Sequence, residues 1–219
     1  VVNHSTEGEP DSVLAAMDDF WDHYYESAGT TEWKLRSAAL DSTINDAKPS
    51  TVMELGTYCG YTAVRIGRLL KPGAKMVSVE VEPLFAAIAS KVVEHAGLRD
   101  VVTVRIGTVV DQLDRVHDQL GSKPLDALLL DHDVDSYLPD LQHLESKGMI
   151  ATNTTVLCDW NLYPGSEASK TGPKAGKEFL EYMKAHAQNK DALQEVHTRP
   201  VSLKPTEAIS KSRITSLSQ

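Results

Sequence analysis

Residues 51–62 are Thr51-Val52-Met53-Glu54-Leu55-Gly56-Thr57-Tyr58-Cys59-Gly60-Tyr61-Thr62, a short apolar run that leads into two glycines. A helical pattern follows from Ala63 to Leu70, and the next apolar run, Met76 to Val79, ends at Glu80. This order predicts a strand, a glycine turn, a helix, a second strand and an acid. In such a unit the turn lets the backbone approach a nucleoside, and the carboxylate holds the ribose hydroxyls.

The spacing of Gly56 and Gly60 is G-x-x-x-G, which differs from the G-x-G-x-x-G of hydride-transfer enzymes. Two glycines after a strand are a weak signal alone, and Glu80 alone is also consistent with an acid at a solvated strand end. Together with Glu54 they favour a nucleoside site. Because the pyrophosphate fingerprint is missing, we expect an adenosyl ligand without phosphates rather than a dinucleotide.

Short apolar runs alternate with helical patterns along most of the chain. The runs that predict strands are 51–55, 76–80, 101–105, 125–130 and 154–158. The helical patterns between them are at about 62–71, 83–96, 109–119 and 135–147. Repeated units of this kind predict an α/β fold with a doubly wound, mostly parallel sheet and ligand sites at the carboxyl ends of its strands.

The two ends of the chain add further elements. Two helices precede the first strand, over 11–24 and 33–47, with Leu35, Ala38, Ala39 and Ile44 expected to face inward. The runs 192–198 and 207–214 predict two terminal strands. We expect one domain over 1–219, with 1–9 and 215–219 frayed.

The composition restricts the partners and the compartment. The chain has 219 residues and a net charge of −9 without a Lys/Arg-rich block, which argues against nucleic acid. No apolar run approaches the roughly 18 residues that span a bilayer. Cys59 and Cys158 lack C-x-x-C spacing, so we expect no disulfide framework and a cytoplasmic protein. The chain starts at Val1 without a methionine, which leaves a removed targeting segment open.

Two predicted strands end in an acid. The segment after one strand begins Asp131-His132, and Asp159 follows the next strand. Paired carboxylates at the ligand-binding edge suit a hard divalent cation such as Mg²⁺. The alternative is that both aspartates cap the turns that follow them. His132 is expected to be structural or to contact a cofactor rather than to act as a base.

A flat substrate pocket is the third predicted feature. The residues that can form its walls are Trp33, Leu35, Trp160, Tyr163 and Pro164. The alternative for Trp33 and Leu35 is an ordinary place in the core, and their spacing does not separate the two interpretations.

The chain resembles the small catechol O-methyltransferases, which use S-adenosylmethionine and Mg²⁺. The similar segments are 52–65, 68–74, Glu80, 86–88, 96–98, 102–103, 130–132, 137–140 and 164–165. The most specific of them is the run Tyr58-Cys59-Gly60-Tyr61, which is unusual among methyltransferases. The resemblance covers roughly residues 10–165 and is poor in the tail.

The resemblance implies a fold, a cofactor and a set of site residues. The implied fold is a seven-stranded, Rossmann-like methyltransferase sheet with two extra N-terminal helices. The implied cofactor contacts are Gly56, Tyr58, Gly60, Tyr61, Thr62, Glu80, Val81, Asp131 and His132. Asp131 and Asp159 correspond to metal ligands, and Trp33, Leu35, Trp160 and Pro164 to the pocket of a small hydroxylated substrate.

Several functional positions of the family are changed. Relatives place a tryptophan and then the proton-accepting lysine where this chain has Asp133 and Val134. The asparagine that is the third metal ligand is replaced by Trp160, and Asn161 comes one residue late. The acid that holds the second catechol hydroxyl falls near Leu203. A general base contributes about 10²–10⁴-fold, so ordinary catechol methylation should be nearly lost.

Two functions therefore remain open. The first is an S-adenosylmethionine-dependent O-methyltransferase of the catechol type with an altered substrate and weak Mg²⁺ binding. In it the base comes from Asp133, His132 or Asp135, with Asp133 the first choice. The second is a cofactor-binding protein that no longer transfers methyl groups and serves another reaction or a binding role. Val134 and Trp160 favour the second.

Overall fold

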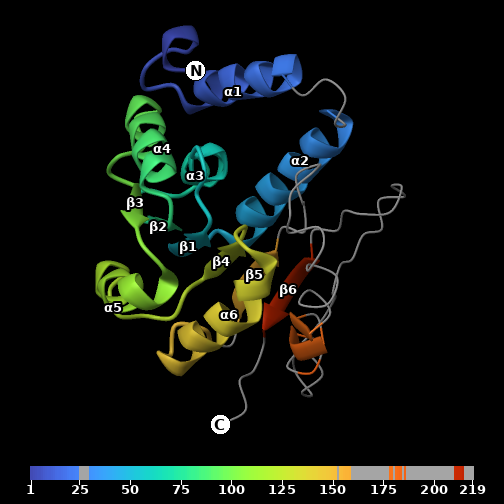
Figure 1. Cartoon of the computed structure of the whole chain (residues 1–219), viewed down its shortest axis with the longest axis vertical. Coiled ribbons are helices and arrows are strands. Elements are labelled where there is room, and N and C mark those ends of the chain that lie inside the picture. Colours follow the sequence, from blue (N-terminus) through green and yellow to red (C-terminus); the bar gives the residue numbers. More distant parts are fainter. Residues whose placement is uncertain are drawn as a thin grey trace. The chain divides into compact units, whose positions relative to one another are not determined.

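The computed structural model describes residues 1–24, 30–151, 153–158, 178–179, 181–183, 185 and 210–214. The helices are η1 (Val2–His4), α1 (Pro10–Tyr24), α2 (Thr30–Ala47), α3 (Tyr61–Gly67), α4 (Pro83–His95), α5 (Val109–Gln119), η2 (Val134–Ser136) and α6 (Tyr137–Ser146). The strands are β1 (Thr51–Leu55), β2 (Lys75–Glu80), β3 (Val102–Ile106), β4 (Ala127–Leu130), β5 (Thr154–Cys158) and β6 (Ser210–Ile214). Figure 1 labels these elements along the ribbon.

The strands follow the predicted topology. Their order in the sheet is β3-β2-β1-β4-β5-β6. The pairs β2–β3, β1–β4 and β4–β5 are parallel, and β6 is antiparallel to β5, with Cys158 opposite Ser210. All five apolar runs form strands, which confirms the mostly parallel α/β fold. The run 192–198 lies outside the described residues, so a seventh strand remains a prediction.

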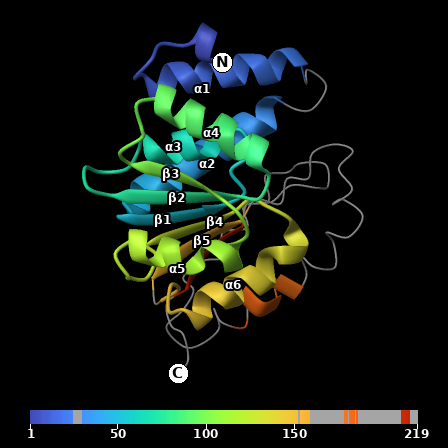
Figure 2. The ribbon, with the colours of Figure 1, turned by 60° about the vertical axis from the view of Figure 1, so that its left-hand side comes forward.

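The chain divides into two compact units, and the first comprises Val1–Ser50 and Thr57–Thr108. In this unit β2 pairs with β3, and α4 packs against both strands (Figure 2). All residues of β2 after Lys75 are buried, as expected for a strand that is covered on both faces. Pro83 occupies the first turn of α4, and Gly97 follows the helix with φ +73°, as the sequence predicts.

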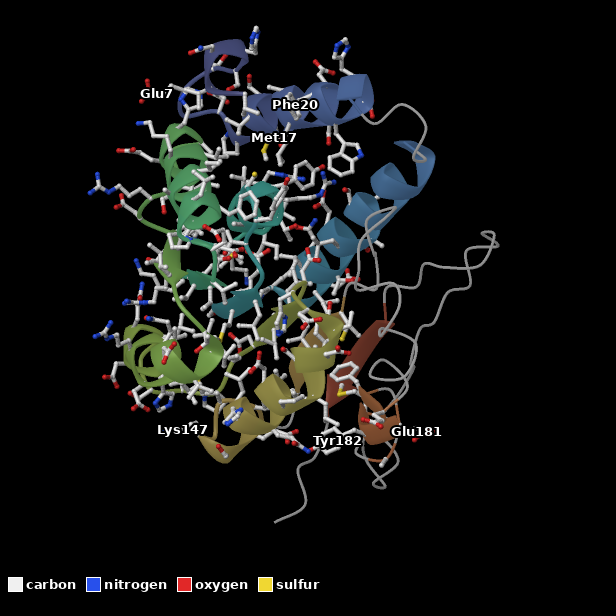
Figure 3. All side chains as sticks on the ribbon, viewed as in Figure 1. Glu7, Met17, Phe20, Lys147, Glu181 and Tyr182 are labelled. Atoms are coloured by element: carbon white, nitrogen blue, oxygen red, sulfur yellow. The ribbon has the colours of Figure 1, made fainter. Side chains whose placement is uncertain are left out.

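The second unit comprises Thr51–Gly56 and Val109–Gln219. Strand β4 is buried along its whole length between β1 and β5. Figure 2 shows α5 and α6 side by side next to β4 and β5. Lys147, just after α6, donates a 2.8 Å hydrogen bond to Asp114 of α5. Tyr182, labelled with Lys147 in Figure 3, donates to Glu145 of α6.

The N-terminal segment contacts the end of α4. The backbone N–H of Gly8 donates to the carbonyl of His95 at 2.8 Å, and the Ser5 hydroxyl lies 3.0 Å from Nε2 of the same histidine. These bonds connect residues 5 and 8 to α4 in the first unit. Fraying of residues 1–9 in solution remains a prediction. In the part of the chain that the structure describes, no helix is long and apolar enough to cross a membrane.

Candidate functional site

Gly56 lies where β1 ends and the glycine turn begins. Its φ is +92°, and a Cβ at this position would lie 2.2 Å from the carbonyl oxygen of Asp131. The backbones are tied there, because Asp131 N–H donates to the carbonyl of Leu55 at 2.8 Å. Only glycine fits both the dihedral angle and the close approach. In the second unit the structure therefore brings Gly56 and Asp131 together.

Glu80, at the carboxyl end of β2, holds the remainder of the glycine turn. Its Oε2 accepts the backbone N–H groups of Thr57 at 3.1 Å and Tyr58 at 2.8 Å. Its Oε1 accepts the N–H of Glu82 at 2.9 Å. Glu80 as a whole is only 7% exposed, and Tyr58 has a positive φ of 47°. We infer that Glu80 fixes the strained turn, a role that the sequence did not indicate.

The two glycines of the turn are required for different reasons. Gly60 has φ +87° and is the N-cap of α3, and a Cβ there would lie 3.1 Å from the Cα of Ala89. The first turn of α3 therefore packs closely against α4. Thr57 adds a hydroxyl contact to Ser78 of β2 at 2.5 Å. Turn, helix and strand are thus held by short polar contacts and close backbone packing.

Apolar side chains are exposed beside the Glu80 carboxylate. Tyr58 is 45% exposed and Val81 is 65% exposed, although both are large hydrophobic residues. The ring of Tyr58 packs edge-on against Phe85, with the ring centroids 4.5 Å apart. Exposed flat and branched groups next to a buried carboxylate suit a ligand with a planar apolar part and hydroxyl groups.

Tyr61 and Thr62 begin α3, and the Tyr61 hydroxyl points into a polar cluster. It accepts a 2.9 Å hydrogen bond from Arg65 Nη1 and lies 3.4 Å from the hydroxyl of Ser37 in α2. Burial raises the pKa of Tyr61 above the ordinary value of a tyrosine. Thr62 is half-buried. A cofactor contact by either residue remains a prediction.

The segment after β4 is organised around His132. Its Nε2 lies 2.9 Å from a carboxylate oxygen of Asp140 in α6. Its ring packs on Tyr137 at 5.0 Å between centroids, and Tyr137 packs on Phe179 at 5.6 Å. Asp140 was not predicted as a partner, although it belongs to the Tyr137-Leu138-Pro139-Asp140 run on which the resemblance rests.

Asp133 and Val134 occupy the positions where relatives have tryptophan and lysine. The two side chains differ in burial. Val134 is 4% exposed and belongs to the core. Asp133 is exposed, and its Oδ1 accepts the N–H of Asp135 at 3.3 Å as the N-cap of η2. The backbone therefore directs position 134 inward, where a valine side chain is well accommodated.

Several predicted site residues lie outside the described part of the chain. They are Asp159, Trp160, Asn161, Tyr163, Pro164 and Leu203. Trp33 and Leu35 lie in the first half of α2, for which only the backbone is described. Within the described residues, no group of three or more His, Cys, Asp or Glu side chains is arranged to hold a metal. The metal site and the substrate pocket remain predictions.

Comparisons with known proteins agree with the resemblance and with the fold. A family model described as O-methyltransferase matches residues 38–190. Catechol O-methyltransferase of Bos taurus is 36% identical over 193 residues, which are 86% of this chain and 65% of the relative. Catechol O-methyltransferase B of Danio rerio is 38% identical over 170 residues, 75% of this chain and 62% of the relative. The chain thus spans less than two thirds of the length of these two relatives.

A solved structure extends the comparison to three dimensions. The O-methyltransferase from Bacillus cereus, in complex with SAH, matches with a TM-score of 0.64 at 18% identity, covering 98% of this chain and 100% of that one. At this identity the match supports the architecture alone. Together with the strand order, it identifies the sheet as Rossmann-like.

Proposed function

Because the chain belongs to the O-methyltransferase family, we propose that it transfers a methyl group from S-adenosylmethionine to a hydroxyl oxygen of a small molecule. The observation that supports this most is the glycine turn fixed by Glu80. The turn follows a buried strand, contains two glycines with positive φ, and leads directly into α3. Turns of this construction let a backbone approach a nucleoside ligand.

The residues at the turn fit an adenosyl cofactor. Each carboxylate oxygen can accept two hydrogen bonds, and Oε1 of Glu80 accepts one from Glu82, which leaves capacity for a ribose hydroxyl. The exposed side chains of Tyr58 and Val81 offer apolar surface to a ring. When bound, the cofactor supplies an electrophilic methyl group on a sulfonium.

We propose that the acceptor differs from plain catechol. The buried Val134 leaves no lysine in the segment after β4 to take the phenol proton. Asp133 is the proposed proton acceptor, because its side chain is exposed and, from the residues that the structure describes, accepts only a 3.3 Å hydrogen bond from the N–H of Asp135. A carboxylate is a weaker base than the lysine it would replace, so acidic phenols are the preferred acceptor class.

The test is a methyl-transfer assay with labelled cofactor against a panel of phenols, ordered by the pKa of the hydroxyl. Transfer to the most acidic phenols, with little to catechol, would support the proposal. Cofactor binding without transfer to any member would contradict it. That result would instead favour a cofactor-binding protein that no longer methylates. The observation in favour of this second function is the burial of Val134 at the position of the family's lysine.

Restoring the lysine should not restore the chemistry. Val134→Lys places a charged group in a position that is 4% exposed, so we expect it to lower the free energy of unfolding by about 2–4 kcal/mol. We expect no gain in catechol methylation. The measurements are chemical denaturation and the labelled-methyl assay. Val134→Met is the control of similar length without charge, with an expected cost of about 1 kcal/mol. A stable Val134→Lys enzyme that methylates catechol would refute this prediction.

We also propose that the protein binds Mg²⁺ weakly, with Asp131 and Asp159 as ligands. Because Trp160 replaces the third ligand of the family, we expect millimolar Mg²⁺ to stabilise the protein by about 1 kcal/mol or less, which raises Tm by about 2–4 °C at most. Asp131→Ala should remove the shift. Thermal melts with and without Mg²⁺ measure it, and an equal shift in the variant would exclude Asp131 as a ligand.

A further inference from the structure

Asp41 of α2 bridges two arginines of the segment that follows the glycine turn. Its Oδ2 accepts from Arg65 Nη2 at 2.8 Å and from Arg68 Nη2 at 2.6 Å. The three side chains, here called the Asp41 cluster, are largely buried, with 21%, 13% and 18% exposed for Asp41, Arg65 and Arg68. Charge-assisted bonds that are shielded from water are among the strongest polar contacts in proteins.

Arg65 extends the cluster in both directions. Its Nε donates to the backbone carbonyl of Ser37 in α2 at 3.2 Å. Its Nη1 donates to the hydroxyl of Tyr61, the first residue of α3, at 2.9 Å. One guanidinium therefore ties α2 to the helix that begins at the glycine turn, and its planar fork fixes both geometries at once.

Few apolar side chains are fully buried in the second half of α2, residues 37–47, where the side chains are described. Within residues 37–47, Ile44 is the only fully buried hydrophobic residue, and Ala38 and Ala39 are exposed. The sequence prediction for Ile44 is confirmed, and the prediction that both alanines face inward is wrong. The other buried residues of this stretch, Ser37 and Thr43, are polar. Without a broad apolar face, the docking of this half of α2 depends on polar bonds.

We propose that Asp41 and Arg65 are positioning residues that hold α2 against α3 and thereby set the acceptor site. The proposal rests on the proposed function and on the prediction, from the resemblance, that Trp33 and Leu35 of α2 belong to the acceptor pocket. Trp33 and Leu35 precede the cluster on the same helix, so a shift of α2 moves them relative to the glycine turn. The turn itself is held by Glu80, which is independent of the cluster. Loss of the cluster should therefore affect the acceptor and spare the cofactor.

The test compares Asp41→Asn with Asp46→Asn in the full chain. Both changes remove one negative charge from α2, and Asp46 is exposed. For Asp41→Asn we expect faster hydrogen exchange of the amides of residues 37–47 and a KM for the phenol acceptor raised about five- to tenfold, because a charge-assisted bond is lost. We expect the calorimetric Kd for S-adenosylmethionine to stay within about twofold, and Asp41→Glu to recover part of the KM. Asp46→Asn should change none of these.

The outcomes separate this inference from the proposed function. Unchanged hydrogen exchange of residues 37–47 in Asp41→Asn would overturn the inference. An equal loss of affinity for the cofactor and the acceptor would also overturn it, because the Asp41 cluster would then stabilise the glycine turn itself. If the unaltered protein transfers no methyl group to any acceptor, the proposed function fails. In that case the affinity for a phenol acceptor, measured by calorimetry in Asp41→Asn and Asp46→Asn, replaces KM. Equal affinities in the two variants, or no binding to either, would overturn the inference.

Discussion

Gly56→Ala is expected to lower the affinity for S-adenosylmethionine at least about 100-fold, or about 2.7 kcal/mol, because the added Cβ forces the backbone of the turn out of place. The added Cβ would lie 2.2 Å from the Asp131 carbonyl oxygen and 2.6 Å from its carbon. Both are backbone atoms, so the turn or the end of β4 must move. We also expect a loss of about 3 kcal/mol in the free energy of unfolding. Calorimetric titration and chemical denaturation measure the two effects.

Gly73→Ala is the matched control for this prediction. Gly73 has a similar φ of +86°, but no atom lies within 4 Å of a Cβ built there. It should therefore show only the cost of a positive φ, about 1–2 kcal/mol, with unchanged cofactor affinity. Equal cofactor affinities in the two variants would mean that the approach of Gly56 to Asp131 has no part in binding.

Glu80→Gln is the second change with a large expected effect. The carboxylate accepts three backbone N–H groups, from Thr57, Tyr58 and Glu82. A glutamine offers one acceptor oxygen and turns an NH₂ group toward the remaining donors, so at least one of these backbone N–H groups loses its partner. We expect a loss of about 2–3 kcal/mol in the free energy of unfolding. Cofactor affinity should fall about 10- to 100-fold, since both the turn and the ribose contact are affected.

The control for Glu80 is its neighbour Glu82. Glu82 is exposed, and its carboxylate accepts the N–H of Leu84 at 3.3 Å as the cap of α4. Glu82→Gln removes the same charge from the same end of β2 and should cost about 0.5 kcal/mol or less. If Glu82→Gln weakens cofactor binding as much as Glu80→Gln does, local charge is responsible rather than the bonds to the turn.

The fold was predictable from the sequence because each element has a strong local signal. Continuous apolar runs predicted the buried parallel strands, and Gly56 and Gly60 marked the turn through the dihedral angles that only glycine adopts easily. Pro83 and Gly97 marked the ends of α4. These signals depend on a few neighbouring residues and are visible without knowledge of the tertiary contacts.

The site was less predictable because its decisive contacts join distant residues. Nothing near Glu80 in the sequence indicates that its carboxylate accepts N–H groups from residues 57 and 58. The pairing of Asp41 with Arg65 likewise depends on how two helices pack. The burial of Val134 and the exposure of Ala38 are also properties of the packed structure. The periodicity of α2 predicted that Ala38 faces inward, which is wrong.

Calorimetric titration of the full chain with S-adenosylmethionine tests the central claim most directly. The account predicts binding with a stoichiometry of one, retained in Gly73→Ala and lost in Gly56→Ala. It predicts that the hydroxyl groups of the ribose contribute, so that the 2′-deoxy cofactor analogue binds more weakly. A folded, unaltered protein that shows no heat of binding at any temperature tested would contradict the account.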